Sequence, residues 1–202
     1  MRNDSENFEA MPMPTAQEHP VAIERPARLQ LDRLPTPIGE ALLVTDEAGV
    51  LRALDFHDHE ARMLRLLRTH YGSMALANGA APGDVTSNLR RYFDGELHAL
   101  RSIAWATAGT PFQRSVWNAL VTIPSGQTRG YGELARLLGI PNASRAVGLA
   151  NGSNPVALVV PCHRMIGANG RLTGYASGLH RKGWLLRHEG ARFSAERTRP
   201  AQ

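Results

Sequence analysis

The chain of 202 residues contains one cysteine, Cys162, and one lysine, Lys182. A single cysteine excludes an internal disulfide and a cysteine-rich metal site. No run of about 18 apolar residues is present, so the sequence predicts no membrane-spanning helix. The polar, acidic first residues lack the pattern of a signal peptide. A free thiol in such a chain is typical of a reducing compartment, and we expect a cytoplasmic protein.

Acidic side chains are fewer than basic ones. The 23 Lys and Arg residues against 18 Asp and Glu residues give a formal charge of +5. This balance favours a polyanionic partner, although modest positive charge is also common in proteins that bind none. Every basic residue except Lys182 is arginine, which suits bidentate phosphate contacts. The base composition of a genome can produce the same bias and is the stronger explanation.

Cys162 follows an apolar run at residues 156–160 and lies within Pro161-Cys162-His163-Arg164. The run predicts a buried strand, which Pro161 would end because proline cannot donate to a ladder. The cationic side chains of His163 and Arg164 would lower the pKa of the thiol and favour the nucleophilic thiolate. From this local context alone, a reactive thiol and a small buried apolar residue are equally supported.

Composition and periodicity divide the chain into four parts. Residues 1–28 are rich in Pro, Glu, Asn and Met and predict a disordered extension. Two domains follow, at residues 29–105 and 110–190, and each is large enough for a core of its own. Residues 191–202 are expected to form a flexible tail.

The N-terminal domain is predicted to contain a small sheet and two helices. Short alternating apolar runs between residues 29 and 56 predict antiparallel strands, with a turn at residues 46–49. Apolar residues at helical spacing predict helices over 59–71 and 85–93. The small residues 72–83 between the helices are expected to form a flexible loop.

The C-terminal domain is predicted to be mostly helical. An apolar stripe predicts a helix over residues 112–123. Residues 134–138 and 143–152 predict two short helices joined by a turn with Gly and Pro, which is the pattern of a helix-turn-helix. Residues 181–189 predict a last helix, with Gly190 as its C-terminal cap.

The second helix of the helix-turn-helix argues against the reading of a base sequence. Only Arg145 among residues 143–152 has a long polar side chain, whereas a helix that reads the major groove needs several. The small side chains could closely approach a minor groove of about 6 Å. Tight packing against a neighbouring helix explains the small residues equally well.

A series of motifs occurs along the chain in one order and at one spacing. They are Thr36-Pro37-Ile38-Gly39, Arg91-Tyr92-Phe93-Asp94-Gly95, Thr110-Pro111-Phe112-Gln113-Arg114-Ser115-Val116-Trp117, Ile123-Pro124-Ser125-Gly126, Tyr131-Gly132-Glu133-Leu134-Ala135, Ser144-Arg145-Ala146-Val147-Gly148, Asn154-Pro155, Pro161-Cys162-His163-Arg164, Gly174-Tyr175, Lys182, Leu185-Leu186 and Glu189-Gly190. With this series the sequence closely resembles the O6-alkylguanine-DNA alkyltransferases, also called methylated-DNA–protein-cysteine methyltransferases. The resemblance is dense from Thr110 to Gly190 and looser between about Leu34 and Trp105.

The resemblance implies an α+β fold in two domains. The N-terminal domain would be ribonuclease H-like, with a small antiparallel sheet and helices. The C-terminal domain would be mostly helical and winged-helix-like, with the helix-turn-helix. The implied activity is DNA repair, in which a nucleotide is flipped out of the duplex and its alkyl group is transferred to Cys162. A thioether has no carbonyl for water to attack, so each chain would act once, and no cofactor is implied.

The resemblance also implies roles for individual residues. Cys162 would be the nucleophile, His163 its base through a water, and Glu189 the acid that orients His163. Tyr131 would donate a hydrogen bond to the leaving guanine, and Arg145 would take the space of the extruded base. The other implied residues are Ser144, Ala146 and Gly148 on the DNA-binding helix, Met165, Tyr175, Ala176 and Ser177 in the substrate pocket, and Asn154 as a hinge between that helix and the active-site turn.

The implied partner is double-stranded DNA carrying O6-alkylguanine, bound by a monomer through the minor groove without sequence preference. The resemblance leaves open whether O4-alkylthymine is a second substrate.

Gly130 departs from the family, because relatives usually carry Ser or Thr there as a helix N-cap. Relatives that hold zinc use cysteines that this chain lacks, so we expect no metal.

Two other classes of function stay open on the sequence. A helix-turn-helix sensor could use Cys162 to report alkylation or a redox change, and it would prefer one operator sequence. A thiol hydrolase built on Cys162, His163 and Glu189 would turn over, so it would form more than one product per chain.

Overall fold

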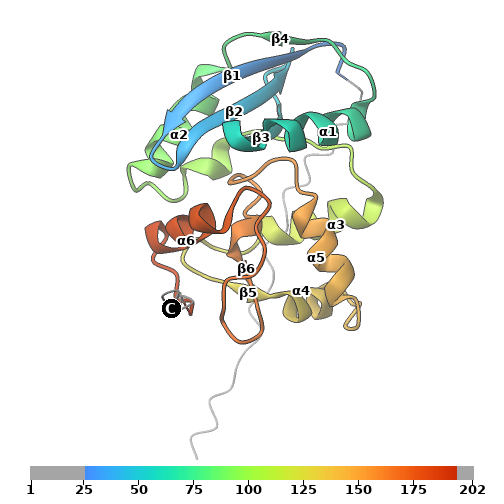
Figure 1. Cartoon of the computed structure of the whole chain (residues 1–202), viewed down its shortest axis with the longest axis vertical. Coiled ribbons are helices and arrows are strands. Elements are labelled where there is room, and N and C mark those ends of the chain that lie inside the picture. The colour runs from blue at the N-terminus through green and yellow to red at the C-terminus, as the bar shows by residue number, and fades with distance from the viewer. Residues whose placement is uncertain (1–25, 195–202) are drawn as a thin grey trace, which may run out of the picture.

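A computed structural model of the chain describes residues 26–194. The predicted extension at residues 1–28 and the predicted tail at 191–202 lie mostly outside the described residues. Within the described range, no helix is both long and apolar enough to cross a membrane. The N-terminal domain stacks on the C-terminal domain along the long axis of the molecule (Figure 1).

The N-terminal domain consists of a four-stranded sheet and two helices, as the sequence predicts. Its elements are β1 (Leu29–Thr36), β2 (Gly39–Asp46), β3 (Leu51–Phe56), α1 (Glu60–Tyr71), β4 (Leu76–Asn78) and α2 (Gly83–Phe93). The strand order is β3-β2-β1-β4, with antiparallel pairs except for β4, which runs parallel to β1. The expectation of a loop over residues 72–83 is therefore wrong at β4. Hydrogen bonds between the flanks of β4 and β1, such as Leu29 N to Ala75 O at 3.1 Å, fix this segment.

The C-terminal domain contains the predicted helices and one very small sheet. Its elements are α3 (Pro111–Val121), β5 (Arg129–Gly130), α4 (Tyr131–Leu137), α5 (Ser144–Gly152), β6 (Met165–Ile166) and α6 (Leu179–His188). α4 and α5 form the helix-turn-helix, and β5 pairs with β6 in parallel. At the start of α3, Thr110 Oγ1 accepts from Gln113 N and Thr110 N donates to Gln113 Oε1, which is a capping box.

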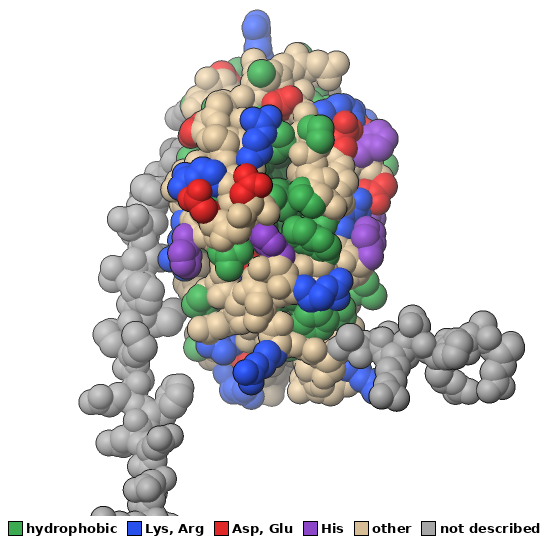
Figure 2. Space-filling model, turned by 90° about the vertical axis from the view of Figure 1, so that its left-hand side faces the viewer, with side chains coloured by type: hydrophobic (Ala, Val, Ile, Leu, Met, Phe, Trp, Pro, Cys, Tyr) green, Lys and Arg blue, Asp and Glu red, His purple; other side chains and the backbone are tan. Residues whose placement is uncertain are grey.

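Surface charge differs between the two domains. On the face shown in Figure 2, acidic side chains gather in the upper half, which the N-terminal domain forms. The charged side chains visible in the lower half are mostly basic. On this face, the C-terminal domain is therefore better suited to a polyanion than the N-terminal domain is.

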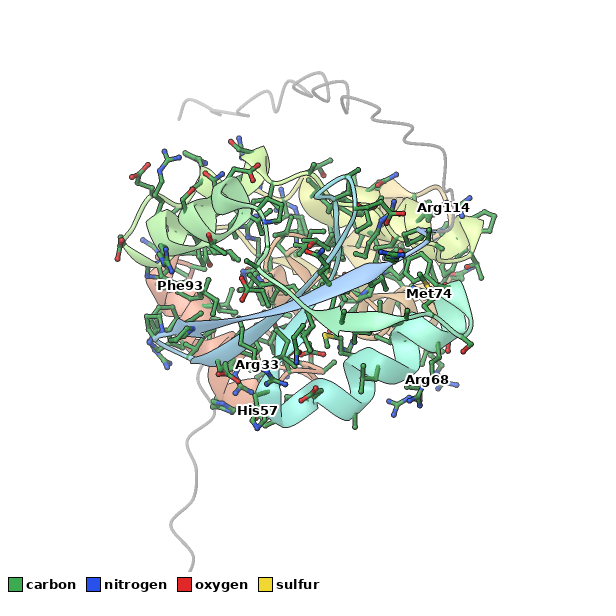
Figure 3. The ribbon with its side chains drawn as sticks, turned by 90° about the horizontal axis from the view of Figure 1, so that it is seen from above. Arg33, His57, Arg68, Met74, Phe93 and Arg114 are labelled. Atoms are coloured by element: carbon green, nitrogen blue, oxygen red, sulfur yellow. The ribbon has the colours of Figure 1, made fainter. Side chains whose placement is uncertain are left out.

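Both faces of the N-terminal sheet are covered. Leu42 and Val44 of β2 pack in one core with Met63 and Leu67 of α1. Residues on the opposite face, such as Leu43, belong to a larger core that continues through α2 into the C-terminal domain. α1 and α2 accordingly lie on opposite sides of the strands (Figure 3). The shared core joins the two domains behind the site described below.

The apolar run before Cys162 is buried but is not a strand, so that prediction is wrong. A single bridge joins Val156 to Leu54 of β3. After it, Val160 N bonds back to Val156 O at 3.0 Å, and Leu158 has a φ of 69°. Prolines at both ends of the run have no N–H for a ladder, so the chain coils into tight turns. The start of these turns is tied to β3, an edge strand of the N-terminal sheet, because Leu54 N donates to Pro155 O and Ala157 N donates to Leu54 O.

Candidate active site

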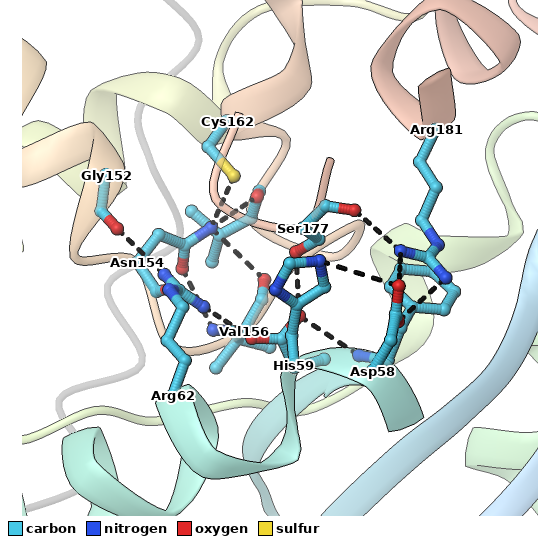
Figure 4. Close-up of polar contacts among 12 residues, drawn as sticks. Asp58, His59, Arg62, Gly152, Asn154, Val156, Cys162, Ser177 and Arg181 are labelled. Carbon is cyan, nitrogen blue, oxygen red and sulfur yellow. Dashed lines mark hydrogen bonds and ion pairs between the residues drawn. The ribbon is translucent and has the colours of Figure 1, made fainter. Parts of the chain in front are cut away.

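Cys162 begins a short 3-10 helix (Cys162–Arg164) and is 6% exposed. Asn154 Nδ2 lies 3.0 Å from the Cys162 sulfur and donates to Val160 O at 2.8 Å (Figure 4). The Asn154 side-chain oxygen accepts from Val156 N at 3.0 Å. Asn154 follows Ser153, the C-cap of α5, so one side chain ties the end of that helix to the turn that carries the thiol.

Burial raises the pKa of the Cys162 thiol, and the bond from Asn154 and the charges of Arg62 and Lys182 oppose this only in part. The expectation that His163 and Arg164 lower this pKa is therefore wrong. His163 is held neutral, and Arg164 is engaged by a carboxylate. The resting side chain is a thiol, and its use as a nucleophile requires a base.

His163 is fully buried and pairs with Glu189. His163 Nε2 and Glu189 Oε1 are 2.9 Å apart. Burial lowers the pKa of His163 and outweighs the opposing effect of Glu189, so the imidazole is neutral and able to accept a proton. Its Nδ1 is buried and has no hydrogen-bond partner among residues 26–194, and no hydrogen bond in that range joins His163 to Cys162. The free nitrogen is the one available to a bridging water.

The carboxylate of Glu189 makes hydrogen bonds with side chains of both domains. Arg164 donates to both carboxylate oxygens, Nε to Oε2 at 2.9 Å and Nη2 to Oε1 at 2.8 Å. Tyr92 Oη, from α2, donates to Oε1 at 2.8 Å. Burial alone would raise the pKa of Glu189, but its hydrogen bonds with His163 and Arg164 and the positive charge of Arg164 hold that pKa far below its usual range. Arg164 also donates to Ile123 O, so it anchors the turn that carries Cys162.

The end of α6 fixes the position of Glu189. Glu189 is the C-cap, and Gly190 follows with a φ of 72°. Gly190 N donates to Arg187 O and Ala191 N to Leu186 O, which together form a Schellman motif. Opposite this cap lies Gly126, where an added Cβ would come within 2.9 Å of Glu189 O. Gly190 therefore supplies the left-handed cap that the sequence predicts.

Tyr131 is brought to the site by the two-residue sheet. Arg129 of β5 pairs with Met165 of β6, so the start of α4 lies beside the turn that carries Cys162. Burial raises the pKa of the Tyr131 phenol, with a further contribution from Cys162, so the phenol keeps its proton. Its Oη accepts from Thr173 Oγ1 at 3.4 Å.

The helix cap before Tyr131 is half preserved despite Gly130. Glu133 Oε2 accepts from Gly130 N at 2.8 Å, which is the reciprocal half of a capping box. Only the bond from a Ser or Thr side chain is missing at this N-cap.

The predicted pocket residues follow or face the same turn. Met165 is fully buried directly after it, and the Tyr175 ring lies 6.5 Å from the His163 ring. Tyr175 Oη is buried without a partner in the described range. Ala176 is half-buried, and Ser177 Oγ donates to Asp55 Oδ1 at 2.7 Å.

Comparison with known proteins assigns both halves of the chain. The 6-O-methylguanine DNA methyltransferase, DNA binding domain, matches residues 111–191. The ribonuclease-like domain of the same methyltransferase matches residues 33–104. The chain belongs to the O6-methylguanine-DNA methyltransferase family.

Individual relatives and structures agree with this assignment. The methylated-DNA–protein-cysteine methyltransferase of Shigella flexneri is 50% identical over 165 residues, 81% of this chain and 96% of the relative. That of Methanosarcina acetivorans is 47% identical over 156 residues, 77% of this chain and 95% of the relative.

Two solved structures have the same fold. The Mycobacterium tuberculosis OGT in complex with DNA is 42% identical, with a TM-score of 0.67 over 80% of this chain and 92% of that one. The O6-methylguanine-DNA methyltransferase of Pyrococcus kodakaraensis has a TM-score of 0.64 at 25% identity over 81% of this chain and 99% of that one.

In this methyltransferase, α5 presents the expected DNA-binding residues. Ser144 and Arg145 are exposed, and Ala146 and Gly148 are half-buried. Leu149, one turn after Arg145, is 72% exposed and was not singled out from the sequence. Gly148 packs toward Tyr131, because a Cβ added there would lie 3.7 Å from the Tyr131 ring. α5 therefore has both a surface face and a face toward the site.

Three residues of the N-terminal domain reach the site and were missed in the sequence analysis, and they are Asp55, Arg62 and Tyr92. Arg62 of α1 bonds to Asp55 Oδ2 at 2.5 Å, to Gly152 O at 2.8 Å and to Asn154 O at 3.0 Å (Figure 4). Tyr92, the third, lies in one of the motifs of the resemblance, which could have indicated it. Asp55 and Arg62 carry no local signal, because the bonds they make reach across about a hundred residues of sequence.

Proposed function

We propose that this methyltransferase repairs DNA by removing alkyl groups from the O6 atom of guanine and transferring them irreversibly to Cys162. The observation that carries the proposal is a buried thiol in one 3-10 turn with a neutral histidine that is held by an ionised glutamate. Members of the family act on methylated DNA by name, and the M. tuberculosis OGT has been solved with DNA.

The reaction begins when the thiol of Cys162 loses its proton. His163 takes the proton at Nδ1 through a water, and Glu189 stabilises the imidazolium that forms. The thiolate attacks the alkyl carbon, the bond from that carbon to O6 breaks, and its electron pair stays with guanine. A hydrogen bond from Tyr131 stabilises the leaving guanine. The product is a thioether that water does not cleave, so the protein acts once.

The DNA is bound through α5 in the minor groove, without sequence preference. Arg145 fills the space of the extruded nucleotide, and Ser144, Ala146 and Gly148 allow close approach of the helix. Met165, Tyr175, Ala176 and Ser177 line the pocket for the flipped base, and Asn154 couples α5 to the thiol. We propose that the protein acts as a monomer, because every group that the reaction uses comes from one chain. We also propose a cytoplasmic location, because a free reactive thiol persists in a reducing compartment.

A direct test is incubation with a duplex that carries one O6-methylguanine, followed by mass spectrometry of the peptide containing Cys162. The proposal predicts a gain of one methyl group on Cys162 and restored guanine in the DNA. A sensor would show affinity for one operator sequence without loss of the lesion, and a hydrolase would release product while Cys162 stayed unmodified. Either result would contradict the proposal.

A further inference from the structure

Among residues 26–194, one hydrogen bond joins the N-terminal domain to the carboxylate of Glu189, and it comes from Tyr92. Its Oη donates to Glu189 Oε1 at 2.8 Å, and Tyr92 is fully buried. The same oxygen faces His163 Nε2 at 2.9 Å and Arg164 Nη2 at 2.8 Å. One carboxylate oxygen therefore carries three contacts, one of which comes from the other domain.

The ring of Tyr92 is held in place without its hydroxyl. It packs edge-on against Phe93, with ring centroids 5.3 Å apart, and against His188 at 5.1 Å. The backbone oxygen of Tyr92 also lies 2.7 Å from His188 Nε2. Because packing already fixes the ring, the contact with Glu189 is a separate feature that can be removed alone.

The hydroxyl of Tyr92 stays protonated, and is a hydrogen-bond donor, over the pH range in which histidine titrates. Burial raises the pKa of Tyr92 well above its usual range, with a further contribution from Glu189, so the phenol keeps its proton. Tyr175 and His188 are the other titratable groups near it, beside Arg164 and the Glu189–His163 pair. An ionised carboxylate in a buried site interacts strongly with such a donor.

We propose that Tyr92 is a positioning residue for alkyl transfer, whose hydroxyl holds Glu189 Oε1 toward His163 and limits the basicity of that carboxylate. The inference rests on the proposed roles of His163 and Glu189. It gives the N-terminal domain a direct part in the chemistry, in addition to its packing.

Removal of the hydroxyl should change both the rate and its pH dependence. With two contacts left, Oε1 is less firmly oriented, and its negative charge is less compensated. A less compensated Glu189 stabilises the imidazolium more, so the pKa of His163 rises. His163 must be neutral to accept a proton, so the acidic limb of the rate profile should move to higher pH.

The experiment measures alkylation of Cys162 by a free O6-benzylguanine probe across the pH range of about 5 to 9, where histidine titrates. The free base needs no DNA contact, so binding to the duplex does not affect the result. Tyr92→Phe should react about tenfold more slowly near neutral pH, the loss expected for one hydrogen bond to a charged group. Its acidic limb should lie about half to one pH unit higher.

The matched control is Tyr71→Phe in the same domain. Tyr71 is 2% exposed and donates to Ala106 O at 3.3 Å, away from Glu189. This variant should keep the wild-type rate and pH profile. A loss in Tyr71→Phe equal to that in Tyr92→Phe would show that both substitutions act through packing, and it would overturn the proposal.

A second measurement separates positioning from stability. In a Glu189→Gln background the carboxylate charge is absent, so Tyr92→Phe should cause no further change in rate or limb position. Wild-type behaviour of Tyr92→Phe, or an unchanged loss in the Glu189→Gln background, would overturn the role given to Tyr92. Failure of the wild-type protein to alkylate Cys162 would instead overturn the proposed function.

Discussion

The two halves of the molecule differ in charge more than the total of +5 suggests. The basic residues of segment 110–190 are nine, and they are Arg114, Arg129, Arg136, Arg145, Arg164, Arg171, Arg181, Lys182 and Arg187. Its only carboxylates are Glu133 and Glu189. In segment 29–105, eight arginines face ten acidic residues. The C-terminal half alone therefore has the charge that a phosphate backbone requires.

The acidic side chains of the two halves also make different contacts. In the C-terminal half, Glu133 caps a helix and Glu189 is buried with His163, so neither opposes DNA along an open surface. In the N-terminal half, Asp55 is fully buried and holds Arg62 and Ser177 in place. The C-terminal half therefore has few exposed acidic groups, whereas the N-terminal half uses the buried carboxylate of Asp55 to hold residues beside the site.

The largest effect should follow from a change in the reacting group of the C-terminal half. Cys162→Ala removes the nucleophile and should abolish alkyl transfer completely, as measured by loss of O6-methylguanine from a duplex. Affinity for undamaged DNA should stay at the wild-type level, because α4 and α5 are untouched. Residual transfer in this variant would place the nucleophile elsewhere.

A change in the N-terminal half should act on stability. Arg62→Ala leaves the buried Asp55 without its charged partner and removes a donor from Gly152 O and Asn154 O. Loss of one partner from a buried pair costs about 3–5 kcal/mol in the free energy of unfolding, measured in urea. Arg33→Ala, in an exposed cluster with Glu40 and Glu60, should change that free energy little. Equal effects of the two substitutions would break the comparison.

An arginine of the C-terminal half should separate base flipping from chemistry. Arg145→Ala should slow repair of duplex DNA by about tenfold to a hundredfold, since extrusion of a base costs a few kcal/mol. Alkylation by a free O6-substituted guanine should be unchanged, because no base is extruded. Arg68→Ala, on the N-terminal domain at the outer end of α1 (Figure 3), should leave both rates unchanged. Equal losses on both substrates for Arg145→Ala would mean that this arginine supports the pocket.

The smallest effect should come from the product itself. A methyl group on the Cys162 sulfur enters a site where that atom is 3.0 Å from Asn154 Nδ2. Overpacking of this kind costs about 1–3 kcal/mol, so the methylated protein should melt at a lower temperature than the free protein without DNA. An unchanged melting temperature would show that the pocket accommodates the group without strain.

The helices and antiparallel strands were predictable because local signals determine them. The stripe that begins at Phe112 and the glycine at residue 190 are local signals, and α3 and the end of α6 lie where these signals place them. The turns after Asn154 were not predictable, because an apolar run indicates that a segment is buried without indicating the path of its backbone. β4 was missed for a related reason, since its pairing with β1 is made across more than forty residues.

The candidate site was predictable only in part. The motif around Cys162 and its resemblance identified His163, Glu189, Tyr131 and Asn154 as candidates, and the structure brings all of them to one turn. The pKa of the thiol was predicted with the wrong sign, because burial is a property of the fold and outweighs the local sequence. For the same reason the contacts of Asp55, Arg62 and Tyr92 could be found only in three dimensions.

The central claim is that Cys162 is a nucleophile that is consumed by one repair event. The most direct test is a titration in which increasing amounts of O6-methylguanine duplex are added to a fixed amount of protein and the removed lesions are counted. The account predicts a plateau at one lesion per chain, with Cys162 methylated to the same extent. Removal that continues beyond one lesion per chain would contradict it.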